Sequence, residues 1–268
     1  MELQRRVADL AAAGYATLVV TPDPVEALAA FAAERAIGYS LLSDAGSDVI
    51  RRVGVLNTLI APDEPDYGLP FPGLFVTDAR GVVTHKVFHR RYQERETADA
   101  LLYGVIGLQL DMSANPSATA DAEVSAVLGA AALGFGQWTE LYVRIALGPG
   151  EHVYGPDVPS GYVATTVAVT APEGIVVGSP RYPHTRPFAI AGLDEQFEVI
   201  EPPAQGAVEI AVPLLSRLPE APDASAAVTL TVDVGYQVCT DVECFLPQRR
   251  QLLVTVPVRR LDRSAPHP

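Results

Sequence analysis

The spacing of apolar residues changes along the chain, and this change constrains the fold more than any other feature. Before about residue 111, segments with the apolar spacing of helices alternate with short, continuous apolar runs. Beyond about residue 136 the helical spacing is lost, and short β-branched runs recur between turn residues. A chain of 268 residues is long enough for two domains. We therefore expect two domains, 1–110 and 122–259, joined by a small, polar linker over 111–121.

The first of these domains is expected to be α/β, because helices and buried strands alternate in it. Asp78-Ala79-Arg80-Gly81 has the composition of a hairpin turn between its last two strands. The pattern predicts helices over 2–13, 24–36, 46–53 and 94–109, and strands over 16–20, 74–77 and 82–87.

The second domain is expected to be an all-β sandwich of immunoglobulin type. About seven short strands, separated by turns such as Gly148-Pro149-Gly150, fit that architecture. Residues 260–268 are interpreted as a tail. The strands are predicted over 138–146, 152–154, 162–170, 197–200, 208–212, 228–238 and 252–258.

Composition excludes several classes of function. The net charge of −13 repels phosphate backbones, so we expect no nucleic-acid partner. No run reaches the roughly 18 apolar residues of a membrane span, and no signal peptide is recognisable. We therefore expect a location in the cytoplasm for the chain as it stands, or outside it if the start is incomplete. No cofactor motif is present, and none is predicted.

The five histidines show no zinc-like spacing with acids or cysteines. We predict no metal site and interpret these histidines as surface residues: His85, His89, His152, His184 and His267.

Only two cysteines occur, Cys239 and Cys244. Five steps along an extended strand cover about 16 Å, whereas a disulfide needs Cα atoms about 5.5–6 Å apart. If the two cysteines pair, residues 240–243 must turn back. Closing so short a loop stabilises a fold by only about 2 kcal/mol, which argues mildly against a purely structural disulfide. The alternatives of a structural disulfide and of two inert thiols remain open at this point.

Residues 2 to about 109 resemble the AhpC/TSA group of peroxiredoxin-like, thioredoxin-fold proteins. The resemblance lies in LLSDAGSDVIRRVGVLN and in the hairpin PFPGLFVTDARGVV. It implies that Pro72 follows a cis peptide bond. It also implies that a first strand and the peroxidatic cysteine lie upstream of Met1, because residues 1–109 contain no cysteine. We expect no peroxidase activity from the chain as it stands.

The strand implied to be missing would lie in the middle of the sheet, between 16–20 and 74–77. Its loss would leave backbone groups unpaired on both neighbours. Three outcomes are open: the true start lies upstream, the two half-sheets close together, or a partner strand fills the gap. We favour a shortened start.

Residues 122–258 resemble the N-terminal domain of thiol:disulfide interchange protein DsbD. The sharpest part is a tyrosine and a glutamine before a close cysteine pair, followed by a proline: Tyr236, Gln237, Cys239, Cys244 and Pro247. The resemblance implies that Cys239 and Cys244 are catalytic, that the other three residues support them, and that the partner is a thioredoxin-like redox protein. It also places a covering loop within residues 182–197, without identifying its contacts.

The leading hypothesis is therefore a thiol–disulfide redox protein that exchanges electrons through Cys239 and Cys244. Asp241 and Glu243 flank the pair, and negative neighbours raise the pKa of a thiol. Such a pair suits a protein that is reduced by an activated partner. The alternatives are an AhpC/TSA-type peroxidase, if the chain begins upstream, and a non-enzymatic β-sandwich that binds a partner.

Overall fold

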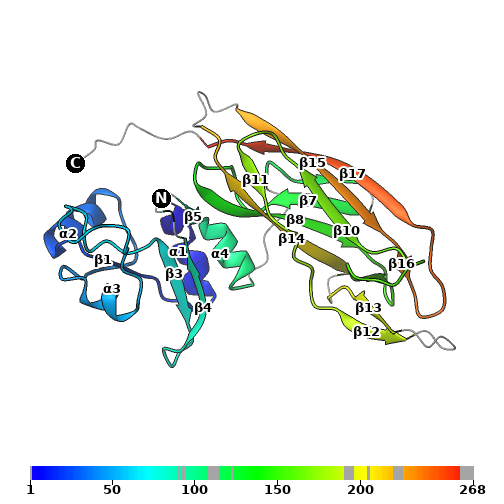
Figure 1. Ribbon diagram of the computed structural model, residues 1–268, viewed down its shortest axis with the longest axis horizontal. Helices are drawn as coiled ribbons and strands as arrows, with labels where there is room; N and C mark the ends of the chain where they lie inside the picture. The colour runs from blue at the N-terminus through cyan, green and yellow to red at the C-terminus, as the bar shows by residue number, and fades with distance from the viewer. Residues whose placement is uncertain are drawn as a thin grey trace. The chain divides into compact units, whose positions relative to one another are not determined.

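The computed structural model of the chain describes residues 2–89, 91, 94–107, 115–121, 123–189, 196–203, 206–219 and 226–259. The chain divides into two compact units, 1–109 and 110–268 (Figure 1). The first is a small thioredoxin-like α/β region and the second is a β-sandwich, which confirms the predicted fold class. None of the helices in the described ranges is long and apolar enough to cross a membrane.

Unit 1 alternates helices with short strands, in the following order: α1 (Glu2–Ala12), β1 (Leu18–Thr21), α2 (Val25–Glu34), β2 (Ser40–Ser43), α3 (Asp48–Arg52), β3 (Gly73–Thr77), β4 (Val83–Phe88), β5 (Arg95–Glu96) and α4 (Ala98–Gly104). β1 and β2 pair in parallel, and β3 and β4 pair as an antiparallel hairpin. The hairpin turn is closed by the Asp78 carboxylate, which accepts hydrogen bonds from the backbone N–H groups of Arg80 and Val82.

Two expectations for this unit are wrong. The last helix, predicted over 94–109, ends at Gly104 and begins only at Ala98, because Thr97 caps it there by accepting a hydrogen bond from the backbone N–H of Ala100. The described residues contain no cis peptide bond, so Pro72 follows a trans bond. The Pro72 carbonyl accepts a hydrogen bond from the His89 N–H next to the paired residues of β3 and β4. A trans X–Pro bond is also favoured by about 0.5–1 kcal/mol unless tertiary contacts demand the cis form.

The two strand pairs of unit 1 do not join in the described residues. β1–β2 and β3–β4 are separate two-stranded sheets, so the half-sheets do not close on each other there. Leu18 and Val20 on β1 and Phe75 on β3 are exposed. These apolar side chains lie on the two strands that were expected to flank a missing central strand.

Unit 2 consists of strands alone in its described residues: β6 (Thr119–Ala120), β7 (Val124–Leu128), β8 (Gln137–Ala146), β9 (His152–Tyr154), β10 (Thr166–Thr170), β11 (Ile175–Val177), β12 (Arg186–Ala189), β13 (Gln196–Ile200), β14 (Ala207–Ser216), β15 (Ala227–Tyr236), β16 (Val238–Cys239) and β17 (Gln248–Pro257). They form sheets with the orders β11-β14-β8-β7-β6, β10-β15-β17 and β12-β13-β9-β16.

The first two sheets enclose the main core of the sandwich. β8 and β14 pair over Trp138–Ala146, and β15 and β17 pair over Ala227–Tyr236. Alternate side chains of both pairs point inward, as the period of two in a strand requires. The inward residues are fully buried and mostly aliphatic, among them Leu141, Val143, Ile210, Val212, Leu230, Val232, Val254 and Val256.

Residues 115–121, which were expected to belong to the linker, pack onto the sandwich. The Asn115 side chain donates to the Leu128 carbonyl, and the Ser117 hydroxyl accepts from the Leu128 N–H. β6 then pairs with β7. The expected linker residues 111–114 lie outside the described residues.

The third sheet positions the two cysteines. After β15 ends at Tyr236, the chain passes Gln237 and enters β16, which pairs with β9 instead of continuing beside β17. Val153 and Val238 face the main core, whereas Tyr154 and Cys239 belong to a second, smaller apolar cluster with Phe197 and Val199. Because side chains alternate between the two faces of β9 and β16, the Cys239 side chain points away from the main core.

Candidate redox site

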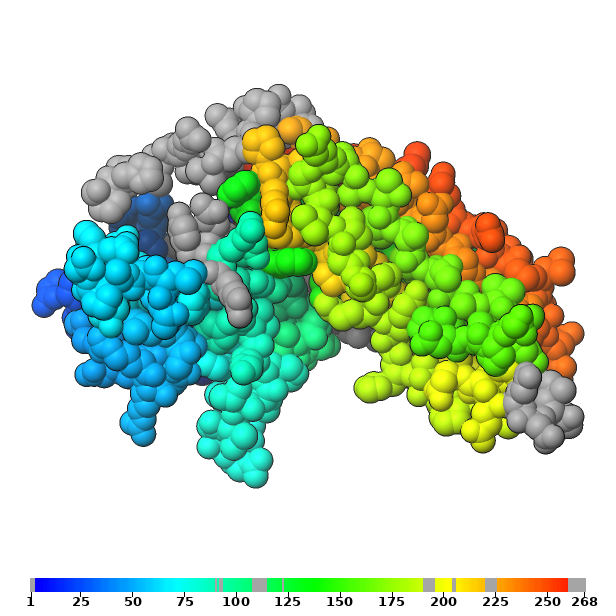
Figure 2. Space-filling view, in the orientation of Figure 1, coloured from blue at the N-terminus to red at the C-terminus, as the bar shows by residue number. Residues whose placement is uncertain are grey.

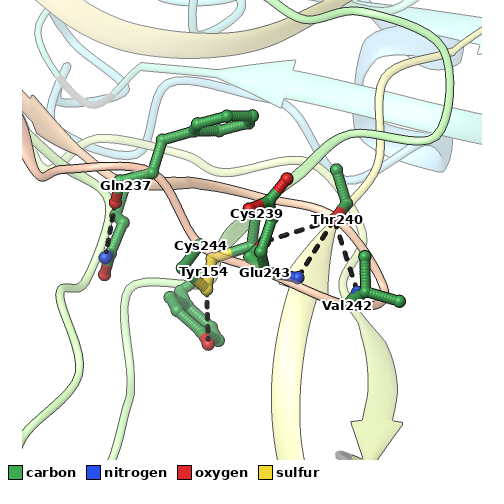
Figure 3. The surroundings of a disulfide bond; sticks show 8 residues. Tyr154, Gln237, Cys239, Thr240, Val242, Glu243 and Cys244 are labelled. Carbon is green, nitrogen blue, oxygen red and sulfur yellow. Dashed lines mark hydrogen bonds between the residues drawn. A yellow bond between two sulfur atoms is a disulfide. The ribbon is translucent and has the colours of Figure 1, made fainter.

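The chain between the two cysteines turns back on itself, as expected for cysteines that pair. Thr240 N–H donates to the Glu243 carbonyl at 2.8 Å, and Phe245 N–H donates to the Val238 carbonyl at 2.9 Å. Cys239 and Cys244 thereby face each other as an antiparallel bridge. Their Cα atoms are 4.0 Å apart and their sulfurs are joined in a disulfide (Figure 3).

Side chains at both ends of the turn fix its shape. The Thr240 hydroxyl accepts hydrogen bonds from the N–H groups of Val242 and Glu243, at 3.3 and 3.2 Å. Gln237 Nε2 donates to the Phe245 carbonyl at 2.9 Å and so ties the strand before the cysteines to the segment after them. Figure 3 shows these contacts on either side of the disulfide. The backbone of the cysteine turn is therefore held by interactions other than the S–S bond.

The two cysteines differ sharply in exposure. Cys239 is 1% exposed within the second apolar cluster, whereas Cys244 is an exposed residue. Figure 2 shows the orange segment that contains the cysteine turn at the surface, at one end of unit 2. The Cys244 side of the disulfide thus lies at the surface, while the Cys239 side faces the protein interior.

Aromatic rings line the buried side of the disulfide. Tyr154 Oη lies 3.6 Å from Cys244 Sγ (Figure 3). Its ring packs edge-on against Tyr162, and Phe197 lies against both. Burial and the neighbouring Tyr162 hold the pKa of Tyr154 above its ordinary value. Tyr154 therefore presents a neutral hydroxyl to the sulfur at neutral pH.

His152 belongs to the same face of β9 as Tyr154. It is 1% exposed and stands directly opposite Cys239 in the pairing of β9 with β16. Its ring packs on Phe188 of β12, with centroids 4.7 Å apart. Burial lowers the pKa of His152; Asp241 and Glu201 oppose that shift, and Arg186 adds to it. The interpretation of all histidines as surface residues is thus wrong for His152.

The exposed side of the disulfide has an apolar rim. Val242 and Leu246 are 91% and 80% exposed, and Phe245 is also exposed. All three lie within two residues of Cys244. Large apolar side chains that gather at a surface are typical of an interaction site.

The three residues predicted to support the cysteines lie in different surroundings. Gln237 contacts the cysteine turn itself. Pro247 is exposed directly before β17. Tyr236 is buried in the main core, where its hydroxyl donates to Glu123 Oε2 at 2.7 Å and contacts neither sulfur. Pro72 belongs to unit 1.

The sequence prediction did not identify Tyr154 and His152, which contact or flank the pair. Their only signal was the prediction of a strand over 152–154. The segment expected to cover the cysteines contributes β12 and β13 to the same sheet as Cys239. Its tip, residues 190–195, lies outside the described residues.

The described part of the chain contains no group of three or more His, Cys, Asp or Glu residues that could hold a metal ion.

Comparison with known proteins gives two family matches. Residues 1–86 match the AhpC/TSA family, and residues 123–256, half of the chain, match the family of the N-terminal domain of thiol:disulfide interchange protein DsbD. Both resemblances noted in the sequence are thereby confirmed. The comparison with curated proteins finds no match.

Among solved structures, the chain is similar to the N-terminal periplasmic domain of ScsB from Proteus mirabilis. The sequence identity is 17% and the TM-score is 0.30. The match covers 55% of this chain and 49% of that one, so this chain spans about half the length of the solved structure.

Proposed function

Because the chain belongs to the family of the N-terminal domain of thiol:disulfide interchange protein DsbD, we propose that its Cys239–Cys244 disulfide exchanges electrons with a thioredoxin-like partner. The observation that carries this proposal is the asymmetry of the pair. One sulfur belongs to an exposed turn and the other to a buried strand. A disulfide that serves only to stabilise a fold has no need of an exposed half, whereas exchange requires that a thiolate can reach one sulfur.

The asymmetry supports an order of attack in the exchange. A thiolate of the partner attacks Cys244 Sγ, the S–S bond breaks, and the electron pair remains on Cys239 Sγ. A second thiol of the partner, as thiolate, then attacks the partner's own sulfur in the mixed disulfide and releases Cys244 as a thiolate. The partner loses two electrons and becomes a disulfide, while this chain gains two electrons and, with two protons, becomes a dithiol.

The surroundings of Cys244 support a protein as the partner. Val242, Phe245 and Leu246 offer apolar area that a protein surface can cover, in a chain whose net charge is otherwise strongly negative. The Tyr154 hydroxyl can donate a hydrogen bond to Cys244 Sγ when that sulfur becomes a thiolate. Hydrogen bonds to a charged group favour its charged form.

Unit 1 does not supply the redox groups. Residues 1–86 are similar to the AhpC/TSA family, yet both cysteines of the chain lie in unit 2. Peroxide reduction by the chemistry of that family needs a thiolate nucleophile. We therefore assign the redox step to unit 2.

Single-cysteine variants test the order of attack. A thioredoxin-like protein is activated as a mixed disulfide with thionitrobenzoate, and the coloured release is followed after it is mixed with each folded variant. Cys239→Ser retains the exposed thiol and should form the covalent complex at least about tenfold faster than Cys244→Ser, because access governs thiol exchange.

The same reaction in denaturant is the control, since both thiols are then equally accessible and the two rates should converge. Equal rates in the folded variants, or faster reaction of Cys244→Ser, would contradict the assignment of Cys244 as the attacked sulfur. Absence of any complex with either folded variant would contradict the proposed function itself.

A further inference from the structure

His152 has a buried nitrogen without a hydrogen-bond partner next to the buried cysteine. Its Nε2 is enclosed and meets no partner among the described residues, and the whole residue is 1% exposed. An unpaired buried nitrogen costs free energy, so such a group calls for a functional or structural explanation. Its ring packs on Phe188.

The pairing of β9 with β16 places His152 opposite Cys239. His152 and Cys239 are directly opposed in antiparallel strands, and Cys239 is in turn bridged to Cys244. Opposed residues of this kind have Cβ atoms about 4.5–5.5 Å apart, with both side chains on the same face of the sheet. The His152 and Cys239 side chains therefore start from neighbouring positions on one face of the sheet, and Cys244 lies across the bridge from Cys239.

We propose that His152 carries the proton to and from Cys239 as the disulfide opens and closes. This inference rests on the proposed function, because it concerns a step within that exchange. It adds a catalytic role to a residue outside the cysteine motif.

Each proton transfer accompanies the breaking or the formation of the S–S bond. On reduction, the S–S bond breaks, its electron pair stays on Cys239 Sγ, and a proton taken from water reaches that sulfur through His152. On reoxidation, Nε2 accepts the proton of the Cys239 thiol. The Cys239 thiolate then attacks Cys244 Sγ in the mixed disulfide and displaces the thiolate of the acceptor, and the proton passes on to water.

The charges around His152 suit a base. Asp241 faces it from the cysteine turn, Glu201 from the end of β13, and Arg186 from β12, where it pairs with Glu201. Tyr154, on β9 itself, is neutral. Burial outweighs the two carboxylates and lowers the pKa of His152, so its imidazole is neutral at pH 7 and free to accept a proton. A buried thiol in apolar surroundings has a raised pKa and therefore needs such a base.

Replacement of His152 by Phe tests the proposal, since Phe keeps the ring that packs on Phe188 and removes both nitrogens. The reduced, folded protein is mixed with oxidised glutathione, and closure of the Cys244–glutathione mixed disulfide is followed between pH 5 and 9. At pH 7, closure in His152→Phe should be at least about tenfold slower than in the wild type. A rise of about one unit in the pKa of a thiol lowers its thiolate fraction by that factor.

The pH profile separates a proton-transfer role from a packing role. The wild-type closure rate should level off at neutral pH, whereas the rate in His152→Phe should keep rising with pH up to 9. His85→Phe is the matched control, because His85 is an exposed histidine of unit 1, and it should behave as the wild type. Unchanged closure and an unchanged profile in His152→Phe would overturn the proposal. If the wild type itself failed to close, the proposed function would fail instead.

A second measurement needs no variant and covers the case in which His152→Phe does not fold. The ring resonances of His152 are titrated by NMR in the oxidised and the reduced wild-type protein. The reduced form should show an additional inflection from the Cys239 thiol, because neighbouring titrations are coupled. Identical titration curves in the two forms would overturn the proposal.

Discussion

At the scale of single residues, Tyr236 is a motif residue that stabilises the fold rather than the redox site. The residue lies in the motif that carries the family resemblance, but its hydroxyl is bonded to Glu123, which also pairs with Arg250. Burial and the adjacent Glu123 hold the pKa of Tyr236 above its ordinary value, so the phenol keeps its proton. Its role in the structure is to anchor the end of β15 in the main core.

Tyr236→Phe should therefore lower the free energy of unfolding by about 1 kcal/mol, which is the typical net value of one such hydrogen bond. The rate at which a thioredoxin-like protein reduces the disulfide should change by less than about twofold. Denaturant unfolding and reduction kinetics check the two parts. Tyr154→Phe is the comparison, because it removes the hydroxyl beside Cys244 and should slow exchange. A Tyr236→Phe variant with slowed reduction would place Tyr236 in the site after all.

The residues around the cysteines could be predicted only in part. The spacing of Cys239 and Cys244 predicted a turn on the condition that they pair, because a disulfide cannot span an extended segment of that length. His152 and Tyr154 reach the pair through the register of β9 against β16, which no local pattern specifies. The prediction thus identified the sulfurs and missed the side chains that set their chemistry.

At the scale of elements, the cysteine turn is a preorganised link between β16 and β17. The Thr240 hydroxyl holds two N–H groups of the turn in addition to the backbone hydrogen bond to Glu243. These contacts keep Cys239 and Cys244 close and so favour the disulfide over the dithiol.

Thr240→Val should shift the equilibrium toward the dithiol by about two- to tenfold, since each hydrogen bond contributes about 0.5–1.5 kcal/mol. The equilibrium constant in dithiothreitol redox buffers measures the shift. Thr255→Val, at an exposed position of β17, is the matched control and should leave the constant unchanged. The same constant in Thr240→Val and the wild type would show that the turn contributes nothing to closure.

The long strands were predicted, and several of the short ones were missed. β8, β14, β15 and β17 each carry enough alternating or β-branched residues to be recognised. β7 lies at the start of a run rich in Ala and Gly, and β11 and β12 have three and four residues; none of these three strands was predicted. β2 was also missed, because four residues give little periodicity. These elements are determined by their neighbours rather than by their own sequence.

At the scale of the whole molecule, the two units differ in how well their apolar side chains are buried. The sandwich of unit 2 encloses a core of fully buried aliphatic side chains between two long strand pairs. The described residues of unit 1 form two separate two-stranded sheets, with exposed apolar residues on β1 and β3. Unit 2 is the part of the chain with both the rigid frame and the two sulfurs that redox exchange requires.

The central claim is that the Cys239–Cys244 disulfide opens and closes within the folded sandwich. Alkylation of the native protein after brief treatment with a reduced thioredoxin-like protein, read out by mass, tests it most directly. We predict two added labels, an unchanged β-sheet circular dichroism spectrum, and loss of both labels on reoxidation. A disulfide that stays unlabelled until the protein is unfolded would contradict the account.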